Sequence, residues 1–309
     1  METNRIENKD GEGINVLSLF DGMSCGQIAL ERAGIIVKNY YASEIDKPAI
    51  NVARFNYPRM TSFGDVNELF FHKGTGFEVK NGDGWLDVPY DGEIDLLIGG
   101  SPCQDISNLS KFKLGLDGSK SSLFYQYWRM WQETKPKYFL LENVAGNKSA
   151  IASITKLMGA RPIRISSNWV SAQNRLRLYW TNIPVNTLPK KRNILLSDIL
   201  QENVDDKYYQ NEGWLKWWER NSGFQLEKGY SSLNAYKAGC LTKRMYASWN
   251  GNFIQDKKGI RRLTPVECER LQTVPDNYTK FVDDKFRYEM LGNGWTVDII
   301  AHILKHMKL

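Results

Sequence analysis

The sequence predicts an α/β protein with buried parallel strands and a second, smaller subdomain. Short apolar runs without alternation, such as residues 94–98 and 137–141, are typical of strands buried on both faces. Segments with helical spacing separate these runs up to about residue 180. From residue 181 to about 259 the alternation stops, tryptophans cluster and charge rises, which indicates a separate subdomain.

Bulk composition excludes several classes of protein. The 309 residues are 42% apolar and 25% charged, as in soluble globular proteins, and no apolar run approaches the ~20 residues of a membrane span. The polar start of the chain is unlike a signal peptide. The four cysteines (25, 103, 240 and 268) form no C-x-x-C pair and there are three histidines, so we expect no metal site, no disulfide framework and a reducing compartment.

Basic residues are concentrated in one segment. Seven of them, with a single acid, lie between Lys237 and Arg262, and this excess equals the net charge of +6 of the whole chain. Such a cluster favours contact with phosphates, while a solvated lysine-rich face is the alternative.

The first elements have the arrangement of a nucleotide-binding fold. A strand over residues 15–20 leads through a turn at residues 21–26 into a helix over 27–33, with Gly34 as its C-cap. A strand over 37–43 ends at Glu44, a helix covers 48–55, and residues 64–66 end a third strand. The turn lacks the G-x-G-x-x-G pattern, so it suits a nucleoside ligand without a pyrophosphate.

Acidic residues follow these strands. Glu44 is placed to bind both ribose hydroxyls, and Asp65 could accept a hydrogen bond from an adenine amino group. Each could equally be a helix cap or a solvated carboxylate, but acids that follow successive strands favour a ligand site.

The later elements extend the pattern. Residues 72–92 are expected to form an exposed loop or hairpin, and residues 104–120 a polar loop that could close as a lid. A helix is expected over 121–134, and strands over 161–170 and 176–180. Thr264, Pro265 and Glu267 form a capping-box pattern for a helix that ends at Leu271. The chain ends with a glycine turn at 291–295 and a helix over 296–306.

Cys103 follows a buried strand, two glycines and Pro102, at the edge of the sheet where ligands bind in α/β proteins. A small buried apolar side chain is the alternative role for a cysteine. Glu142 follows the next strand and is expected at the same edge, partly removed from water and suited to proton donation. Arg175 and Arg177 are two residues apart in an expected strand, so they should face one side and could hold oxygens of a base or phosphate.

These segments together resemble the DNA (cytosine-5) methyltransferase family, in the family's order, over about residues 15–180 and 261–309. The segments are Phe20-Asp-Gly with Gly26, Glu44, Asp65, Gly100-Ser-Pro-Cys103-Gln, Glu142-Asn-Val144, Gln173-Asn-Arg175-Leu-Arg177, Arg262-Leu-Thr-Pro with Glu267 and Arg270-Leu-Gln272, and Gly292-Asn293. Several details are similar to the catalytic domain of the mammalian de novo enzymes, and Asn293 is similar to bacterial and phage members.

The resemblance implies a Rossmann-like sheet that binds S-adenosylmethionine and releases S-adenosylhomocysteine, with a small target-recognition subdomain. Phe20 would stack on adenine, Glu44 would hold the ribose, Asp65 and Val66 the adenine edge, and Asn293 and Trp295 would close over the methionine end. The implied cofactor-binding residues are Phe20, Asp21, Gly22, Met23, Cys25, Gly26, Glu44, Ile45, Asp65, Val66, Gly100, Pro102, Leu123, Asn293, Gly294 and Trp295.

The resemblance also implies a reaction on cytosine in double-stranded DNA. Cys103 would add to C6 and so activate C5, Glu142 would bind N3 and the 4-amino group, and Arg177 would bind O2. Arg175 would steady a loop or a phosphate. The base must be flipped out of the duplex, with Leu109 as the candidate wedge. DNA contacts are expected from Ser107, Leu109, Lys111, Thr242, Lys243 and Arg244.

The expected domains are residues 1–180 with 261–309 for catalysis and residues 181–260 for target recognition. Alternatives are a catalytically silent DNA-binding or regulatory relative, an RNA cytosine-5 methyltransferase and a small-molecule Rossmann enzyme. A cytoplasmic, nucleoid-associated enzyme of a bacterial or phage-infected cell is expected. The target sequence, a cognate restriction endonuclease and the oligomeric state stay open.

Overall fold

The computed structural model describes residues 13–90, 92–102 and 122–309. The chain forms two compact units. The first contains the residues up to Ile165 together with Leu176–Thr187 and Ala301–Leu309, and the second contains Ser166–Arg175 and Leu188–Ile300. Within the described part of the chain, every helix is too short or too polar to cross a lipid bilayer.

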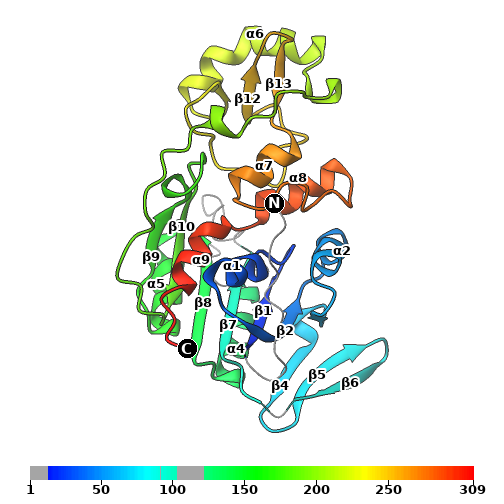
Figure 1. The fold of residues 1–309 in the computed structure, drawn as a ribbon, viewed down its shortest axis with the longest axis vertical. Helices are drawn as coiled ribbons and strands as arrows, with labels where there is room; N and C mark the ends of the chain where they lie inside the picture. Colours follow the sequence, from blue (N-terminus) through cyan, green and yellow to red (C-terminus); the bar gives the residue numbers. More distant parts are fainter. Residues whose placement is uncertain (1–12, 91, 103–121) are drawn as a thin grey trace. The chain divides into compact units, whose positions relative to one another are not determined.

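A seven-stranded sheet organises the first unit (Figure 1). Its order is β3-β2-β1-β7-β8-β10-β9, with β1 Ile14–Leu19, β2 Val37–Ser43, β3 Thr61–Ser62, β7 Leu96–Gly100, β8 Tyr138–Val144, β9 Ile163–Ser166 and β10 Leu176–Thr181. The pairs β1–β2, β2–β3, β1–β7 and β7–β8 are parallel, and β10 runs antiparallel to β8. The predicted α/β class and Rossmann-like sheet are therefore confirmed.

The strand order reverses beside β1. The chain proceeds from β1 outward to β3 and then returns to β7 on the other side of β1. In the register, Leu19 lies beside Gly99, and Gly100 lies beside Glu142. Ligands bind outside the carboxyl ends of the strands at such a reversal, so the turns after β1 and β7 mark the side of the sheet where a ligand is expected.

Helices cover both faces of this sheet. Helices α4 (Ser122–Thr134) and α5 (Lys148–Met158) share an apolar core with one face, where Phe124 and Ile154 are fully buried. Helix α1 (Cys25–Ala33) lies on the opposite face, in front of the sheet in Figure 1, and α2 spans Lys47–Asn56. A Cβ on Gly26 of α1 would come within 2.5 Å of Ile98 Cδ1, so glycine allows this helix to approach the sheet closely.

Strands β4 (Leu69–His72), β5 (Gly76–Asn81) and β6 (Gly84–Pro89) form a separate antiparallel sheet. The hairpin predicted within residues 72–92 is thus confirmed, while β4 was not predicted. Residues 64–66 do not end a strand, contrary to the prediction. Gly64 has a φ of +80°, and a 3-10 helix, η1, begins at Val66 with Asp65 as its N-cap.

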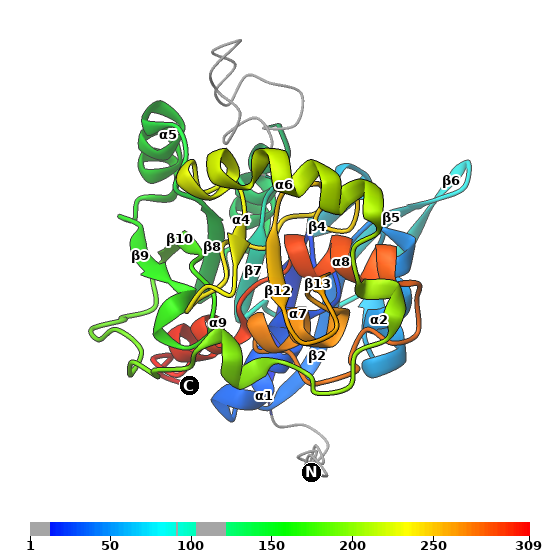
Figure 2. The ribbon, with the colours of Figure 1, turned by 90° about the horizontal axis from the view of Figure 1, so that it is seen from above.

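The second unit has a small sheet and a tryptophan-rich core. Strands β11 (Ser232–Leu233), β12 (Asn252–Gln255) and β13 (Ile260–Arg262) form the sheet, and helix α6 (Glu212–Glu227) lies across it (Figure 2). The stacked rings of Trp214 and Trp218 pack against Phe253. The unit also holds the 3-10 helices η3 (Ser167–Trp169), η4 (Leu196–Ile199) and η5 (Asp206–Tyr208), and the helices α7 (Pro265–Leu271) and α8 (Asp284–Asn293).

Three further boundaries differ from the prediction. The strand expected over 161–170 ends at Ser166, where η3 begins. The expected glycine turn at 291–295 is the last turn of α8, followed by α9 (Val297–Leu304). Residues 261–300, expected with the catalytic domain, pack in the second unit, because β13 pairs with β12 and Arg261 pairs with Glu267 of α7.

Candidate active site

Most of the predicted site residues of the first unit follow the strands at one edge of the large sheet. Asp65 follows β3, Glu44 follows β2, the turn at residues 20–24 follows β1, and Pro102 follows β7. Glu142 lies near the end of β8. Because these strands are parallel, their carboxyl ends form one continuous edge.

The turn after β1 has an unusual backbone. Phe20, Gly22 and Ser24 have φ angles of 56°, 59° and 61°, in the left-handed region that side chains rarely adopt. Residues in such conformations persist where the surroundings hold them and often mark functional sites. The partly buried Phe20 packs against the core of the sheet, so its ring is held beside the end of β1.

Asp21 fixes this turn from within. Its carboxylate accepts hydrogen bonds from Ser18 Oγ and Tyr40 OH, both at 2.6 Å, and from Ser24 Oγ. The pKa of Asp21 is raised to about 6, chiefly by burial and to a smaller extent by the negative charge of Glu44, while the three hydroxyls act to lower it. The carboxylate is therefore committed to internal hydrogen bonds.

Glu44 links the ends of β1 and β2. Its Oε2 accepts a hydrogen bond from the backbone N–H of Gly22 at 2.8 Å, and its Oε1 accepts from the N–H groups of Ile45 and Asp46. The side chain of Ile45 is 69% exposed beside it. A fixed carboxylate next to an open apolar side chain suits a nucleoside, which has ribose hydroxyls and a flat base.

Other residues predicted to bind the cofactor are buried or pack against the core. Met23, Cys25 and Val66 are buried, and Leu123 packs against the core. Gly26 is required by the approach of α1 to Ile98, as described above.

Asp65 has the helix-cap role that the sequence left open. Its Oδ1 accepts from both the backbone and the side-chain nitrogen of Asn67, at 2.9 and 2.8 Å. The cap uses this one oxygen.

Glu142 and Arg177 form an ion pair at the same edge. Glu142 Oε1 lies 2.9 Å from Arg177 Nε, and their side chains are 11% and 14% exposed. The antiparallel register places Tyr179 beside Glu142 and Arg177 beside Val144, so both charged side chains point to one face. A carboxylate and a guanidinium fixed together can recognise a planar ligand with donors and acceptors.

Asn143 is a site residue to which the sequence gave no role. It is 1% exposed, and its Nδ2 donates to Ser101 Oγ at 3.0 Å and to Ser101 O at 3.3 Å. It thereby ties β8 to the turn that leads to residue 103. A buried amide in an apolar strand was the available signal, but its partner lies 42 residues away.

Cys103, Ser107, Leu109 and Lys111 lie outside the described residues. The turn before Cys103 is described: Ser101 is buried, and Gly100 and Pro102 are partly exposed.

Arg175 does not share a strand with Arg177, contrary to the prediction. β10 begins at Leu176, and Arg175 belongs to the second unit. It is 4% exposed and donates hydrogen bonds to the carbonyls of Leu241, Gly292 and Gly294 at 3.0–3.2 Å. Its observed role is to hold the loops of that unit together.

The basic segment of the second unit divides into two groups. Thr242, Lys243 and Arg244 are exposed, as DNA contact requires. Arg261 is buried in an ion pair with Glu267, and Arg262 and Lys237 donate to backbone carbonyls. Only part of the excess charge is therefore available to phosphates.

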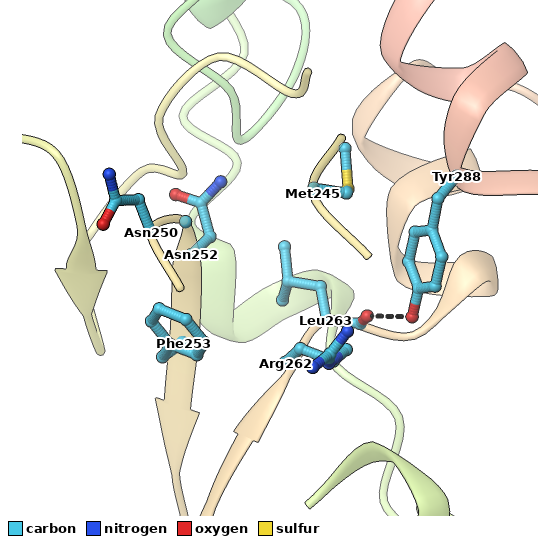
Figure 3. A pocket seen from close by; sticks show the side chains of 8 residues that line it. Met245, Asn250, Asn252, Phe253, Arg262, Leu263 and Tyr288 are labelled. Carbon is cyan, nitrogen blue, oxygen red and sulfur yellow. Dashed lines mark hydrogen bonds between the residues drawn. The ribbon is translucent and has the colours of Figure 1, made fainter. Parts of the chain in front are cut away.

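A small pocket lies beside the exposed segment (Figure 3). Met245, Phe253 and Leu263 are its apolar lining residues, and Asn252 and Arg262 are polar lining residues. Asn252 is held by Ser232 and Gly239, and Arg262 donates to Tyr246 O. The pocket therefore belongs to the framework that supports the exposed segment.

The described residues bring together no group of three or more His, Cys, Asp or Glu side chains that could hold a metal ion.

Comparisons with known proteins give a consistent result. The family model for C-5 cytosine-specific DNA methylases matches residues 14–155 and 163–309. The type II methyltransferase M1.ScrFI of Lactococcus lactis subsp. cremoris is 27% identical over 98% of this chain and 80% of its own length. The type II methyltransferase M.NlaX of Neisseria lactamica is 27% identical over 95% of this chain and 96% of its own.

Solved structures share the fold. The Entamoeba histolytica methyltransferase EhMeth has a TM-score of 0.70 at 18% identity, covering 96% of this chain and 98% of its own. The S. pombe Dnmt2 methyltransferase has a TM-score of 0.68 at 17% identity, covering 94% of this chain and 97% of its own.

Proposed function

Since the chain belongs to the C-5 cytosine-specific DNA methylase family, an enzyme family, we propose that it methylates C5 of a flipped-out cytosine in duplex DNA through a bond from Cys103 to C6. The observation that carries this proposal is the edge of the large sheet. There the Glu142–Arg177 pair adjoins the turn that leads into Cys103, and the β1 turn lies on the other side of that turn.

The residues at the β1 and β2 ends fit S-adenosylmethionine. A Cβ on Gly22 would meet no atom within 4 Å, so this turn leaves space for a ligand. Glu44 would hold the ribose hydroxyls, and Phe20 and Ile45 would cover the faces of the adenine. When bound, S-adenosylmethionine supplies an electrophilic methyl group.

The chain's own residues would prepare cytosine to accept that group. The Cys103 thiolate forms a bond to C6, and the electron pair of the C5–C6 double bond then makes C5 nucleophilic. Glu142 stabilises this adduct by hydrogen bonds to N3 and the 4-amino group, and Arg177 holds O2. After transfer, the C5 proton leaves to water, the C5–C6 double bond re-forms and Cys103 is released.

The ion pair supports these roles for Glu142 and Arg177. A free carboxylate at this position would rotate, but Arg177 fixes one of its oxygens. Asn143 supports them further, because it fixes the turn before Cys103 to the same strand. A nucleophile and its partner groups gain rate from being held in one geometry before the substrate arrives.

DNA is the proposed macromolecular substrate, since a cytosine inside a duplex must be flipped out to reach this edge. The exposed Thr242, Lys243 and Arg244 would contact the duplex, and Leu109 is the proposed wedge. Type II relatives support DNA modification in the cytoplasm of a bacterial or phage-infected cell, with or without a cognate endonuclease.

Bisulfite sequencing of plasmid DNA from cells that express the protein tests the proposal and reveals the target. We expect methylcytosine in one fixed sequence context. Cys103→Ser should abolish methylation while duplex binding by the purified protein is retained. Methylation by the Cys103→Ser variant, or none by the intact protein with S-adenosylmethionine, would contradict the proposal.

Glu142→Gln gives a second, independent measurement. Gln keeps the shape but loses the charge and the acid, so we expect methyl transfer to fall by about 10²–10⁴-fold. Gly223→Ala is the matched control, since its Cβ would meet no atom within 4 Å and it lies in α6.

A further inference from the structure

A charged pair on helix α4 holds the segment between β3 and β4. Arg129 Nη1 lies 2.7 Å from Glu133 Oε1, about one helical turn further on, and both side chains are 24% exposed. Nη2 of the same guanidinium donates hydrogen bonds to the carbonyls of Val66 and Leu69, at 2.9 and 2.8 Å. Nε donates to Gln126 Oε1 at 2.8 Å. Every guanidinium nitrogen therefore has an acceptor within the protein, and one planar side chain fastens the segment to the helix.

The same pair covers the outer edge of β4. In the sheet of order β4-β5-β6, β4 is an edge strand, so alternate backbone groups face away from β5. The Leu69 carbonyl accepts from Arg129, and the Phe71 N–H donates to Glu133 Oε2 at 3.0 Å. The ring centroid of Phe70 lies 4.7 Å from Arg129 Cζ, which adds a cation–π contact. The charged pair thus serves β4 in place of a neighbouring strand and fixes it against α4.

This clamp begins at the residues proposed to meet the adenine edge. The 3-10 helix η1 (Val66–Glu68) has Asp65 as its N-cap, and Val66 is 3% exposed. Asp65 Oδ1 accepts both hydrogen bonds of the cap, from the backbone and the side chain of Asn67. Its Oδ2 accepts none from the described residues, so this oxygen is available to an amino group of a ligand. Because a hydrogen bond weakens steeply with poor distance and angle, the position of η1 decides whether Oδ2 can accept from adenine.

We propose that Arg129, braced by Glu133, is a positioning residue that holds Asp65 against the amino group of the cofactor's adenine, so that the site selects adenine over a purine without this group. The inference rests on the proposed function. Arg129 acts through the backbone of η1 and β4, since its own nitrogens are bonded to protein acceptors. A site built to pair with an amino group rejects an analogue that lacks it, because the acceptor is then left unpaired.

Arg129→Met tests this, because Met keeps an unbranched apolar stem and loses every donor. The affinities of S-adenosylhomocysteine and of S-inosylhomocysteine, in which an oxygen replaces the 6-amino group, are measured by calorimetry on the purified protein. For the intact protein we expect S-adenosylhomocysteine to bind about tenfold or more tightly than S-inosylhomocysteine. In Arg129→Met this ratio should fall toward one, because η1 is no longer held where Asp65 can accept. A role confined to stability would weaken both ligands equally and leave the ratio unchanged.

Two further variants sharpen the measurement. Asp65→Ala removes the acceptor, so its ratio should be close to one, and adding Arg129→Met to it should change the ratio no further. Lys80→Ala is the matched control. Lys80 lies 3.1 Å from Glu68 of the same 3-10 helix, but their side chains are 43% and 44% exposed. An exposed ion pair contributes little, so Lys80→Ala should keep the full ratio.

If Arg129→Met does not fold, Arg129→Lys is measured instead. A lysine can pair with Glu133 but cannot also hold both carbonyls and Gln126, so the ratio should again fall. A ratio of one in the intact protein, or an unchanged ratio in a folded Arg129 variant, would overturn the inference. Failure of the proposed function is distinguishable, because the intact protein would then bind neither ligand or methylate no cytosine.

Discussion

Asp21 should make the stability of the first unit depend on pH in the opposite sense to an ordinary acidic residue. Its pKa is raised from 3.8 to about 6, chiefly by burial. The folded state then binds a proton more tightly than the unfolded state. Its contribution to stability is therefore greatest below pH 4 and is lost as the pH rises to about 6 and above.

The size of the effect follows from the two pKa values. At 1.36 kcal/mol per tenfold change in proton affinity, a rise from 3.8 to about 6 corresponds to about 3 kcal/mol of unfolding free energy. Other groups titrate in the same range, so the intact protein alone does not isolate this contribution. Asp21→Asn removes the titrating group and keeps the shape of the side chain.

The assay is urea unfolding of both proteins at several pH values from 4 to 7. The unfolding free energy of Asp21→Asn minus that of the intact protein should rise by about 2.4 kcal/mol across this range, since part of the full effect lies below pH 4. Asn keeps one acceptor oxygen for Ser18 and Tyr40 and loses the hydrogen bond that Ser24 donates to Oδ2, and this loss shifts the difference by the same amount at every pH. Parallel stability curves for the two proteins would refute the reasoning.

Three further changes have definite expected results. Gly26→Ala should lower the free energy of unfolding, measured in urea, by about 1–3 kcal/mol, because its Cβ would meet Ile98 at 2.5 Å. Gly223→Ala should leave the free energy of unfolding unlowered, because its Cβ would meet no atom within 4 Å. Arg261→Met should cost about 3–5 kcal/mol in the same measurement, because Glu267 would be left buried without its partner, and a milder loss would contradict that account. Asn143→Leu should reduce the rate of methyl transfer in steady-state assays more than it changes duplex affinity, because it releases Ser101, and equal loss of both would count against a positioning role.

Local patterns predicted the large sheet and its edge. Strands β7 and β8 begin with runs of adjacent apolar residues, and the residues that follow a strand are fixed by chain continuity. Glu44 directly follows β2, as predicted, whereas Glu142, predicted to follow a strand that ends at residue 141, lies inside β8, which continues to Val144.

Contacts between distant residues were not predictable in this way. Asn143 finds Ser101 only after β7 and β8 have paired. Arg175 and Arg177 look equivalent in the sequence, but the strand begins between them, and a strand start is among the least certain features of a pattern. Arg261 was counted as an available cation because its ion pair with Glu267 forms only on folding.

The two arginines buried in the second unit differ in a way that bears on DNA binding. Arg261 is neutralised by the Glu267 carboxylate, so it adds no net charge to the surface segment near it. Arg175 has no carboxylate partner among the described ion pairs, and its hydrogen-bond acceptors include three carbonyls, two of them at the carboxyl end of α8. Carbonyl groups at a helix end carry a partial negative charge, which favours a guanidinium beside them. Through its hydrogen bond to Leu241 O, Arg175 therefore holds the start of the loop that carries the proposed DNA contacts Thr242 and Arg244.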